Sequence, residues 1–489
     1  MSKDVIAGLE PKIMWEKFYD LSQIPRPSKK EEKIREFTRN FAKERNLKFK
    51  EDEVGNIVIL VPATPGYENA PTVIIQGHLD MVCEKNKGTV HDFDNDPIKF
   101  IKDGDWIKAD GTTLGADNGI GVAAGMAVAD DASVIHGPLE LLCTVDEETG
   151  LTGVNNLQPG FVEGKVMLNL DSEEDGAFYV GCSGGQDTVG YFNIEKADAT
   201  SGFTAYELLI GGLKGGHSGL DVNTGKANAI KFLGRLLRKL EGLQYEIAEM
   251  NAGSKRNAIP REAEVVILFD TKNEEAVRTI INSFVNDVRA EYKSTDGNAE
   301  VELKKNDSSF DKVFAPVFTK KIVSLILTAP HGVVEMNHDI EGLVETSTNL
   351  ATVNTEGEKL RIGTSQRSSI ESAKRAVSGA VQAAFELAGA VSVEIGDGYP
   401  GWTPNMDSEL LKTCKVVFKG QYGKEPHIKA IHAGLECGIL GDKYPGMDMI
   451  SFGPTIQGAH SPDEKVNIAD VEKFYTLVKG VLLEYANRK

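Results

Sequence analysis

Short runs of apolar residues mark the first part of the chain, and acidic residues follow each of the three clearest runs. These runs are Thr72–Gln76, Leu139–Val145 and Val166–Leu170. Their length and the turn-forming residues around them predict buried strands. Helical patterns lie between the runs, so we expect mostly parallel connections in an α/β sheet. In such a sheet the binding site lies at the carboxyl ends of the strands, where the acidic residues stand.

Two helix starts are predicted from capping patterns. Ser28–Glu31 has the form of a capping box. Asp117 precedes a helix rich in small residues, among them Ala123, Ala124 and Ala127. We therefore expect Ser28 and Asp117 to act as helix caps, and the small residues to allow close packing of the second helix on the sheet.

The order of strands and helices changes near Asp187. A strand pair is expected there, formed by Thr188–Asn193 and Tyr206–Gly211, and amphipathic helices follow in two runs of similar element order. This pattern is typical of an α+β domain, and strand-like residues at Val391–Ile395 then indicate a return to the first domain. We predict a first domain in two parts with an α+β domain inserted between them, with the boundaries 1–186, 389–489 and, for the insertion, 187–388.

The composition is that of a globular protein with an acidic balance. The 489 residues are 41% hydrophobic and 26% charged, with a net charge of −19, and a chain of this length forms two or more domains. The negative charge argues against nucleic acid or an anionic membrane surface as a partner. The five cysteines are scattered, and neither a signal-peptide pattern nor a membrane-spanning run is evident, so we expect a cytoplasmic protein with free thiols.

Seven side chains near the predicted strand ends carry the candidate chemistry. They are two imidazoles and five carboxylates: His78, Asp80, Asp117, Glu147, Glu148, Asp171 and His460. Two histidines with a surplus of carboxylates suit a pair of divalent ions such as zinc, manganese or cobalt. Asp80 stands two residues from His78, where a carboxylate can fix the orientation of a metal-binding imidazole. Glu147 and Glu148 are adjacent and point in different directions, so one can bind an ion while the other transfers protons.

Each of these residues also has a structural explanation when it is taken alone. Asp117 is explained as a helix cap, Asp171 as a turn residue after a strand, and the Glu147–Glu148 pair as a solvated turn. Their combination at the ends of apolar strands in one domain favours the metal site. So many carboxylates in one place would repel one another unless cations neutralised them.

The order of several short motifs resembles that of the di-zinc exopeptidase family, which includes carboxypeptidase G, acetylornithine deacetylase and dipeptidases. The motifs are GHLDMV, LGADNG, DEETG, LNLDSE, GGHSG, NAIP and GAHSP. Within that family, the longer segments HLDMVCEKN, TTLGADNGIG, DEETGLTG, SGGQDT and FGPTIQGAHSPDE resemble the dipeptidase branch, which acts on aminoacyl-histidine and other unblocked dipeptides. The resemblance extends over nearly the whole chain. It implies a mostly parallel-sheet metallopeptidase domain with an inserted α+β lid domain.

The resemblance also implies a set of metal ligands, and the chain departs from the family pattern at none of them. Asp117 would bridge two divalent ions. His78 and Asp171 would hold one ion, and Glu148 and His460 would hold the other. Zinc is the first expectation for both ions, with cobalt and manganese left open.

The two remaining acids of the cluster would act on the ligands and on the reaction. Asp80 would orient His78. Glu147 would be the general base that activates the water between the ions and later protonates the leaving amine.

Three residues of the inserted domain would bind the substrate if that domain is the lid. His217, which lies among glycines, would present its imidazole to a developing oxyanion. Asn257 and Arg367 resemble the family's groups for the C-terminal carboxylate, and the bidentate fork of arginine suits that role. Without the resemblance, His217 is explained as an exposed loop residue and Arg367 as a surface residue near a helix start. Glu436 is left open between a partner for a substrate amine and a helix-cap acid.

The expected function is metal-dependent hydrolysis of unblocked dipeptides, including Xaa-His, with Glu147 as general base. An N-acyl amino acid deacylase or a carboxypeptidase of the same fold is the alternative. A non-catalytic metal-binding or receptor module is disfavoured, because the general base is present. We expect a small peptide substrate and a homodimer, and we leave open the preferred dipeptide and whether His217 acts in cis or in trans.

Overall fold

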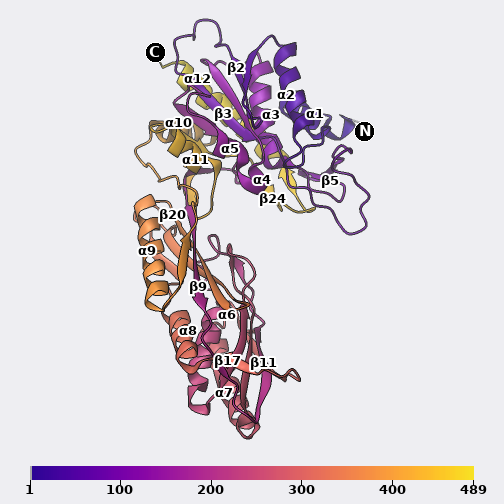
Figure 1. The fold of residues 1–489 in the computed structure, drawn as a ribbon. Helices are drawn as coiled ribbons and strands as arrows, with labels where there is room; N and C mark the ends of the chain where they lie inside the picture. The colour runs from indigo at the N-terminus through magenta and orange to yellow at the C-terminus, as the bar shows by residue number, and fades with distance from the viewer. Residues whose placement is uncertain (1–2, 489) are drawn as a thin grey trace. The chain divides into compact units, whose positions relative to one another are not determined.

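The structure is a computed structural model and describes residues 3–488. The chain divides into two compact units, both drawn in Figure 1. The first unit consists of Met1–Gly181, Trp402–Ala430 and Leu435–Lys489. The second unit consists of Cys182–Gly401 and Ile431–Gly434. The first unit is therefore built from segments that lie on both sides of the second in the sequence.

An eight-stranded sheet organises the first unit, in the order β1-β2-β6-β3-β7-β23-β8-β22. Its strands are β1 (Lys48–Glu51), β2 (Ile57–Val61), β3 (Val73–His78), β6 (Leu139–Thr144), β7 (Val166–Asn169), β8 (Ala177–Cys182), β22 (His427–Ile431) and β23 (Asp448–Ser451). The central strands β6, β3, β7 and β23 are parallel, whereas β1, β2 and β8 pair antiparallel. The expected α/β class is confirmed, and the carboxyl ends of β3, β6 and β7 share one edge of the sheet.

Helix α3 (Ala116–Asp130) packs on β3 through its small residues. A Cβ added at Gly125 would lie in ordinary contact with Ile75 and Leu141, but one at Gly121 would lie 2.5 Å from the carbonyl oxygen of Leu170. Only glycine allows this approach of the helix to the sheet. The close packing that the small residues predict is therefore confirmed.

The other α-helices of the first unit surround this core. They are α1 (Lys12–Ser22), α2 (Glu32–Glu44), α4 (Glu147–Gly150), α5 (Thr152–Asn156), α10 (Glu409–Tyr422), α11 (Glu436–Lys443) and α12 (Ile468–Ala486). Helix α1 packs against α3, and α10 packs against both α12 and β23. Among residues 3–488, none of the helices combines the length and the apolar character that crossing a membrane requires.

A small sheet in the first unit anchors the loop that carries His460. Its order is β24-β25-β5-β4. The strands are β4 (Phe100–Asp103), β5 (Trp106–Ala109), β24 (Ile456–Gln457) and β25 (Lys465–Asn467). Strands β24 and β25 form a hairpin, so residues 458–464 are its loop. Since β25 also pairs with β5, the hairpin is fastened to the segment that precedes α3.

The second unit is built on a nine-stranded sheet in the order β16-β11-β15-β13-β19-β20-β9-β21, with β18 paired to β19. Its strands are β9 (Gly184–Asn193), β11 (Phe203–Gly211), β13 (Glu246–Ala252), β15 (Ala263–Asp270), β16 (Glu300–Lys305), β18 (Gly332–Met336), β19 (Val344–Glu356), β20 (Lys359–Ser368) and β21 (Ser392–Ile395). The two runs of similar element order meet where β13 pairs with β19.

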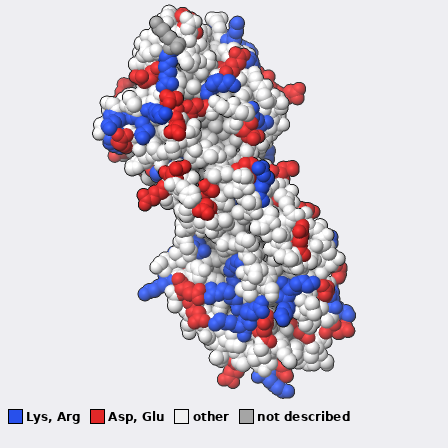
Figure 2. Space-filling view, turned by 90° about the vertical axis from the view of Figure 1, so that its left-hand side faces the viewer, with Lys and Arg blue, Asp and Glu red and all other residues white. Residues whose placement is uncertain are grey.

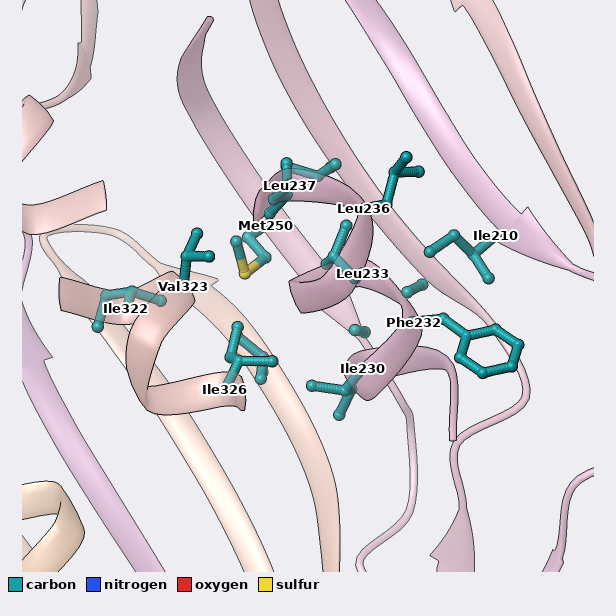
Figure 3. Close-up of a cluster of buried hydrophobic side chains, with 14 of the residues drawn as sticks. Ile210, Ile230, Phe232, Leu233, Leu236, Leu237, Met250, Ile322, Val323 and Ile326 are labelled. Carbon is teal, nitrogen blue, oxygen red and sulfur yellow. The ribbon is translucent and has the colours of Figure 1, made fainter. Parts of the chain in front are cut away.

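Four helices cover this sheet and bury the apolar faces that their sequences predict. They are α6 (Ala229–Leu240), α7 (Glu274–Glu291), α8 (Pro316–Thr328) and α9 (Glu371–Leu387). Figure 3 shows Leu233 and Leu237 of α6 in one cluster with Ile322, Val323 and Ile326 of α8. Alternate residues of β11 and β15 complete this core, as the two-residue period of a strand requires.

Two of the strand expectations for this region are wrong. Residues 392–395 do not return to the first sheet, because β21 pairs with β9 and forms an edge of the second sheet. Strands β9 and β11 do not pair with each other. Strand β9 lies between β20 and β21, whereas β11 lies between β15 and β16. The sequence pattern predicts both strands but does not fix their partners, which are chosen by long-range packing.

Charged side chains of both signs are interspersed on the face shown in Figure 2. Although the net charge is −19, the acidic side chains therefore do not form an unbroken acidic surface on that face.

Candidate metal centre

His78 is the last residue of β3, and its buried ring lies between carboxylates. The Nδ1 atom is 3.2 Å from the backbone oxygen of Asp80 and 3.4 Å from its Oδ1. The Nε2 atom is 3.1 Å from Oδ1 of Asp117 and 3.3 Å from Oδ1 of Asp171. One ring nitrogen thus faces Asp80, and the other faces the carboxylates of Asp117 and Asp171.

Asp117 lies in the first turn of α3 but does not cap it. Its φ/ψ angles are not helical and its side chain makes no capping hydrogen bond within the described residues, so the expected cap is wrong. The carboxylate instead reaches two histidines, with Oδ1 near Nε2 of His78 and Oδ2 3.1 Å from Nε2 of His460. The physical reason is that both carboxylate oxygens face histidines of the candidate site, and Glu464 accepts the N–H groups of Ala116 and Asp117 at this helix start.

His460 joins Asp117 from the other end of the sequence. It lies in the β24–β25 loop with a φ of 62°. Its Nε2 atom is 3.1 Å from Oδ2 of Asp117 and 3.1 Å from Oε2 of Glu148. The side chain of His460 is 56% exposed, whereas that of Glu148 is only 3% exposed. The ring therefore closes the cluster on its solvent side.

The ligand atoms fall into two groups of the size that a metal ion needs, and Asp117 belongs to both. One group is His78, Asp117 and Asp171, and the other is Asp117, Glu148 and His460; within each, the atoms lie within 4.8 Å of one another. Oε1 of Glu148 is buried and has no hydrogen-bond partner in the described part of the chain, and Oδ1 of Asp171 is buried with Nε2 of His78, 3.3 Å away, beside it. Buried carboxylate oxygens without donors are unfavourable unless a cation meets them. The residues present therefore fit a pair of divalent ions.

Asp80 is fully buried and holds the neighbouring glutamates as well as His78. Its Oδ1 accepts the N–H of Glu147 at 3.0 Å, and its Oδ2 accepts the N–H of Glu148 at 3.2 Å and the hydroxyl of Ser28 at 2.8 Å. Burial alone would raise the pKa of Asp80. The pKa is instead lowered to about 2, because His78 interacts with the carboxylate through a hydrogen bond and through charge, and Ser28 and the Glu147 amide donate further hydrogen bonds.

The contact between Ser28 and Asp80 also overturns the predicted capping box. Helix α2 begins at Glu32, and neither Ser28 nor Glu31 makes a side-chain cap there. Glu31 instead accepts the N–H groups of Lys29 and Asp146. The competing partners are buried groups of the candidate site, which the local pattern cannot reveal.

Glu147 begins α4 and belongs to neither of the two groups that contain Asp117, but it forms a third such group with His78 and Glu148. Its carboxylate lies within 4.8 Å of ligand atoms of His78 and Glu148. Burial raises its pKa well above the ordinary value, and the acids Asp171 and Glu436 add to the effect, while His78 opposes it. A partly buried carboxylate with a raised pKa has the character of a general acid and base.

Two further buried groups brace the site, and the sequence motifs do not single them out. Glu464 accepts backbone N–H groups at the start of α3. Arg26 donates from Nη1 to the carbonyl oxygens of Leu79 and Asp80, and from Nη2 to that of Gly115. The sequence signal for Glu464 is its place at the end of the segment FGPTIQGAHSPDE, four residues after His460.

Glu436 is fully buried below the strand ends, which argues against contact with a substrate amine. Its Oε2 accepts hydrogen bonds from Nε2 of Gln76 at 2.5 Å and from the hydroxyl of Thr144 at 2.8 Å. It makes no side-chain cap at the start of α11 among the described residues. Burial raises its pKa to about 7.

In the second unit, Arg367 and His217 lie in one polar cluster. Nη1 of Arg367 donates to the hydroxyl of Tyr399 at 2.9 Å, Nε donates to the hydroxyl of Ser218 at 3.3 Å, and Nη2 lies 3.4 Å from Nε2 of His217. Nδ1 of His217 accepts the N–H of Leu220 at 3.0 Å, which leaves the proton of the neutral ring on Nε2. Burial, followed by the charge of Arg367, lowers the pKa of His217.

Asn257 is exposed and lies with Arg367 on the wall of one pocket of the second unit. The pocket has a volume of about 1050 Å³. Arg256 and Arg361 also line it, so its wall carries several guanidinium groups. Asp187, Glu394 and Asp397 line the same pocket, and Arg256 is paired with Asp187 at 2.6 Å, so the wall carries charges of both signs.

Residues 74–484 match the model of peptidase family M20/M25/M40. This match covers most of the chain, and the chain therefore belongs to this peptidase family.

Individual relatives are similar over almost the full length. The chain is 39% identical over 482 residues to the cytosol non-specific dipeptidase of Escherichia coli (strain K12). This match covers 98% of this chain and 99% of the relative. It is 41% identical to the aminoacylhistidine dipeptidase from Vibrio alginolyticus, whose crystal structure superposes with a TM-score of 0.90 over 98% of each chain. The structure of aminopeptidase PepT from Bacillus cereus ATCC 10987 matches with a TM-score of 0.58 at 16% identity, covering 98% of this chain and 100% of that one, and shows a shared fold alone.

Proposed function

We propose that this protein is a metal-dependent dipeptidase that hydrolyses unblocked dipeptides, including those with a C-terminal histidine. The observation that carries the proposal is the arrangement around Asp117, whose two oxygens face two separate groups of histidine and carboxylate ligands. The near full-length similarity to two dipeptidases supports the substrate class.

Two zinc ions would occupy the two ligand groups, with Asp117 between them. His78 and Asp171 would complete the first site, and Glu148 and His460 the second. Cobalt or manganese suits the same donor set. When bound, the ions would lower the pKa of a water molecule and polarise the scissile carbonyl.

Glu147 is the proposed general base. Its carboxylate lies beside the ligand groups, and burial raises its pKa above the ordinary value, which favours a group that both takes and returns a proton. It takes a proton from the attacking water and returns it to the amine that leaves. Asp80 has an orienting role, because it holds the backbone of Glu147 and faces Nδ1 of His78, which leaves Nε2 directed at the carboxylates.

Residues of the second unit are proposed to recognise the substrate. Arg367 would bind the C-terminal carboxylate of the dipeptide, with Asn257 beside it on the same pocket wall. His217 would donate its Nε2 proton to the oxyanion that forms at the scissile carbonyl. The hydroxyls of Tyr399 and Ser218 hold the guanidinium of Arg367 in place for this role.

The test of the proposal is the nearly isosteric substitution Glu147→Gln, with the metal content of the purified protein measured alongside activity. We expect hydrolysis of a free dipeptide such as Ala-His to fall by about 10²- to 10⁴-fold with the metal retained. Turnover within about tenfold of the wild-type value, in a metal-loaded variant, refutes the general-base role.

A substrate panel separates this function from its alternatives in the same fold. Free dipeptides, N-acyl amino acids and longer peptides are assayed with the reconstituted wild-type protein. Preference for N-acyl amino acids would indicate a deacylase, and release of C-terminal residues from longer peptides would indicate a carboxypeptidase.

We further propose that the protein works in the cytoplasm as a homodimer. The location is supported by the name of the Escherichia coli relative and by the free thiols of Cys83, Cys143 and Cys414. Light scattering of the purified protein measures the oligomeric state directly, and a monomer at assay concentration would rule the dimer out.

A further inference from the structure

Glu464 sits in the β24–β25 loop, and its carboxylate is buried against the start of α3. The side chain is 2% exposed. Oε2 accepts the N–H groups of Leu114 at 2.7 Å and Gly115 at 2.9 Å. Oε1 accepts the N–H groups of Ala116 at 2.7 Å and Asp117 at 3.2 Å. One side chain thus meets four consecutive backbone donors.

This geometry is specific to a carboxylate. The first N–H groups of a helix have no partner within the helix and carry partial positive charge, so they bind an anion. A carboxylate has two oxygens that only accept, and each can take two N–H groups. An amide at this position would turn an NH₂ donor towards two of the four N–H groups.

The contact fixes two of the proposed metal ligands at once. The N–H of Asp117 is bonded to Glu464, which leaves the Asp117 carboxylate directed at His78 and His460. His460 stands four residues before Glu464 in the same loop and has a left-handed φ of 62°. A left-handed residue that is not glycine is strained, so the loop needs an anchor to hold it. Glu464 supplies that anchor.

Arg26 holds the same backbone from its carbonyl side. Its guanidinium donates to the oxygen of Gly115 and to those of Leu79, at 3.0 Å, and Asp80, at 2.9 Å. The segment before Asp117 is therefore fastened through its N–H groups to Glu464 and through a carbonyl oxygen to Arg26. This arrangement links the end of β3, the start of α3 and the His460 loop.

We propose that Glu464 is a positioning residue of the metal centre, which holds Asp117 and His460 at the spacing that the second ion requires. The inference rests on the proposed function, because it takes these two residues as ligands. Its distinguishing consequence is that loss of Glu464 weakens metal binding while the fold and the affinity of the loaded protein for its dipeptide persist.

The experiment compares Glu464→Gln with the matched control Glu140→Gln. Glu140 lies on β6, is 3% exposed, and its carboxylate accepts the N–H groups of Glu163 and Gly164. Both changes remove a buried carboxylate that binds backbone N–H groups in the first unit, but Glu140 touches none of the proposed ligands. Zinc binding to the chelator-treated proteins is measured by competition with a chromophoric chelator, and circular dichroism reports the fold.

We expect zinc affinity to fall about 10- to 100-fold in Glu464→Gln and to stay at the wild-type value in Glu140→Gln. Excess zinc should restore dipeptide hydrolysis by Glu464→Gln with an unchanged KM. The proposal is overturned by wild-type zinc affinity in Glu464→Gln or by an equal loss in Glu140→Gln.

A second pair of variants covers the case in which Glu464→Gln does not fold. Glu464→Asp keeps both acceptor oxygens on a shorter side chain, and it is compared with Glu140→Asp by the same zinc titration and the same criteria. Failure of the proposed function would look different from failure of this inference, because the wild-type protein would then bind zinc but not cleave dipeptides.

Discussion

Replacing Asp80 with asparagine should destabilise the metal-free protein and weaken metal binding, because its carboxylate serves several donors. Oδ1 accepts the N–H of Glu147 at 3.0 Å and lies 3.4 Å from Nδ1 of His78. Oδ2 accepts the N–H of Glu148 at 3.2 Å and the hydroxyl of Ser28 at 2.8 Å. Asparagine replaces one of these oxygens with an NH₂ group, so at least one buried N–H faces another donor.

The magnitude follows from the pKa of Asp80. Burial alone would raise this pKa, but the interactions with His78, Ser28 and the Glu147 amide lower it from 3.8 to about 2. At about 1.4 kcal/mol per pKa unit, the folded metal-free protein favours the ionised side chain by about 2 kcal/mol. Because the folded pKa lies below the unfolded one, this stabilisation is complete above about pH 4 and is lost as the pH falls towards 2.

The assay is denaturant unfolding of chelator-treated proteins, followed by circular dichroism at neutral and at acidic pH. Asp296→Asn is the matched control, since Asp296 is a buried carboxylate of the second unit that accepts the N–H groups of Lys214 and Ala227, both at 2.7 Å. We expect Asp80→Asn to lose about 2 kcal/mol at neutral pH and zinc affinity to fall about 10- to 100-fold. Asp296→Asn should keep its zinc affinity. Wild-type stability of Asp80→Asn at neutral pH, or a deficit that does not shrink on acidification, would show the reasoning to be wrong.

Two further predictions concern the ions and the substrate. Removing the metal with a chelator should abolish dipeptide hydrolysis and lower the Tm, because an ion at 100 times its Kd stabilises the folded state by about 2.7 kcal/mol; a Tm that does not respond to added zinc contradicts this. Arg367→Lys should raise the KM for free dipeptides by about tenfold or more with a smaller change in kcat, because lysine cannot form the bidentate contact with a carboxylate. A dipeptide amidated at its C-terminus is the control substrate, and an equal effect on both substrates would argue against the carboxylate contact.

The part of the fold that local patterns determine could be predicted from the sequence. The continuous apolar run of β3 marks a strand buried on both faces, and the small residues of α3 mark its contact with the sheet. The partners of the individual strands could not be predicted from these local patterns. Residues 392–395 alternate like any strand, and their place beside β9 depends on residues about 200 positions away in sequence.

The candidate site likewise has a part that the sequence predicts and a part that it does not. Its ligand types could be named because histidines and carboxylates follow apolar strands, although the roles assigned to them remain predictions. The local expectations for Ser28 and Asp117 were wrong, because each meets a distant partner in place of its own helix: Asp80 in one case and two histidines in the other. Glu464 was missed for the same reason, since its four donors lie about 350 residues before it.

Residues with a positive φ occur beside the candidate metal centre. Six described residues other than glycine have a positive φ, and three of them, Asp146, Leu151 and His460, border the candidate metal centre. Each such residue costs about 1 kcal/mol or more, and the cost persists only where the surrounding contacts determine the conformation. Asp146 is held by Thr149 and Thr152, and His460 lies in the loop that Glu464 anchors. The contacts that maintain these positive φ values therefore also hold the segments that carry Glu147, Glu148 and His460.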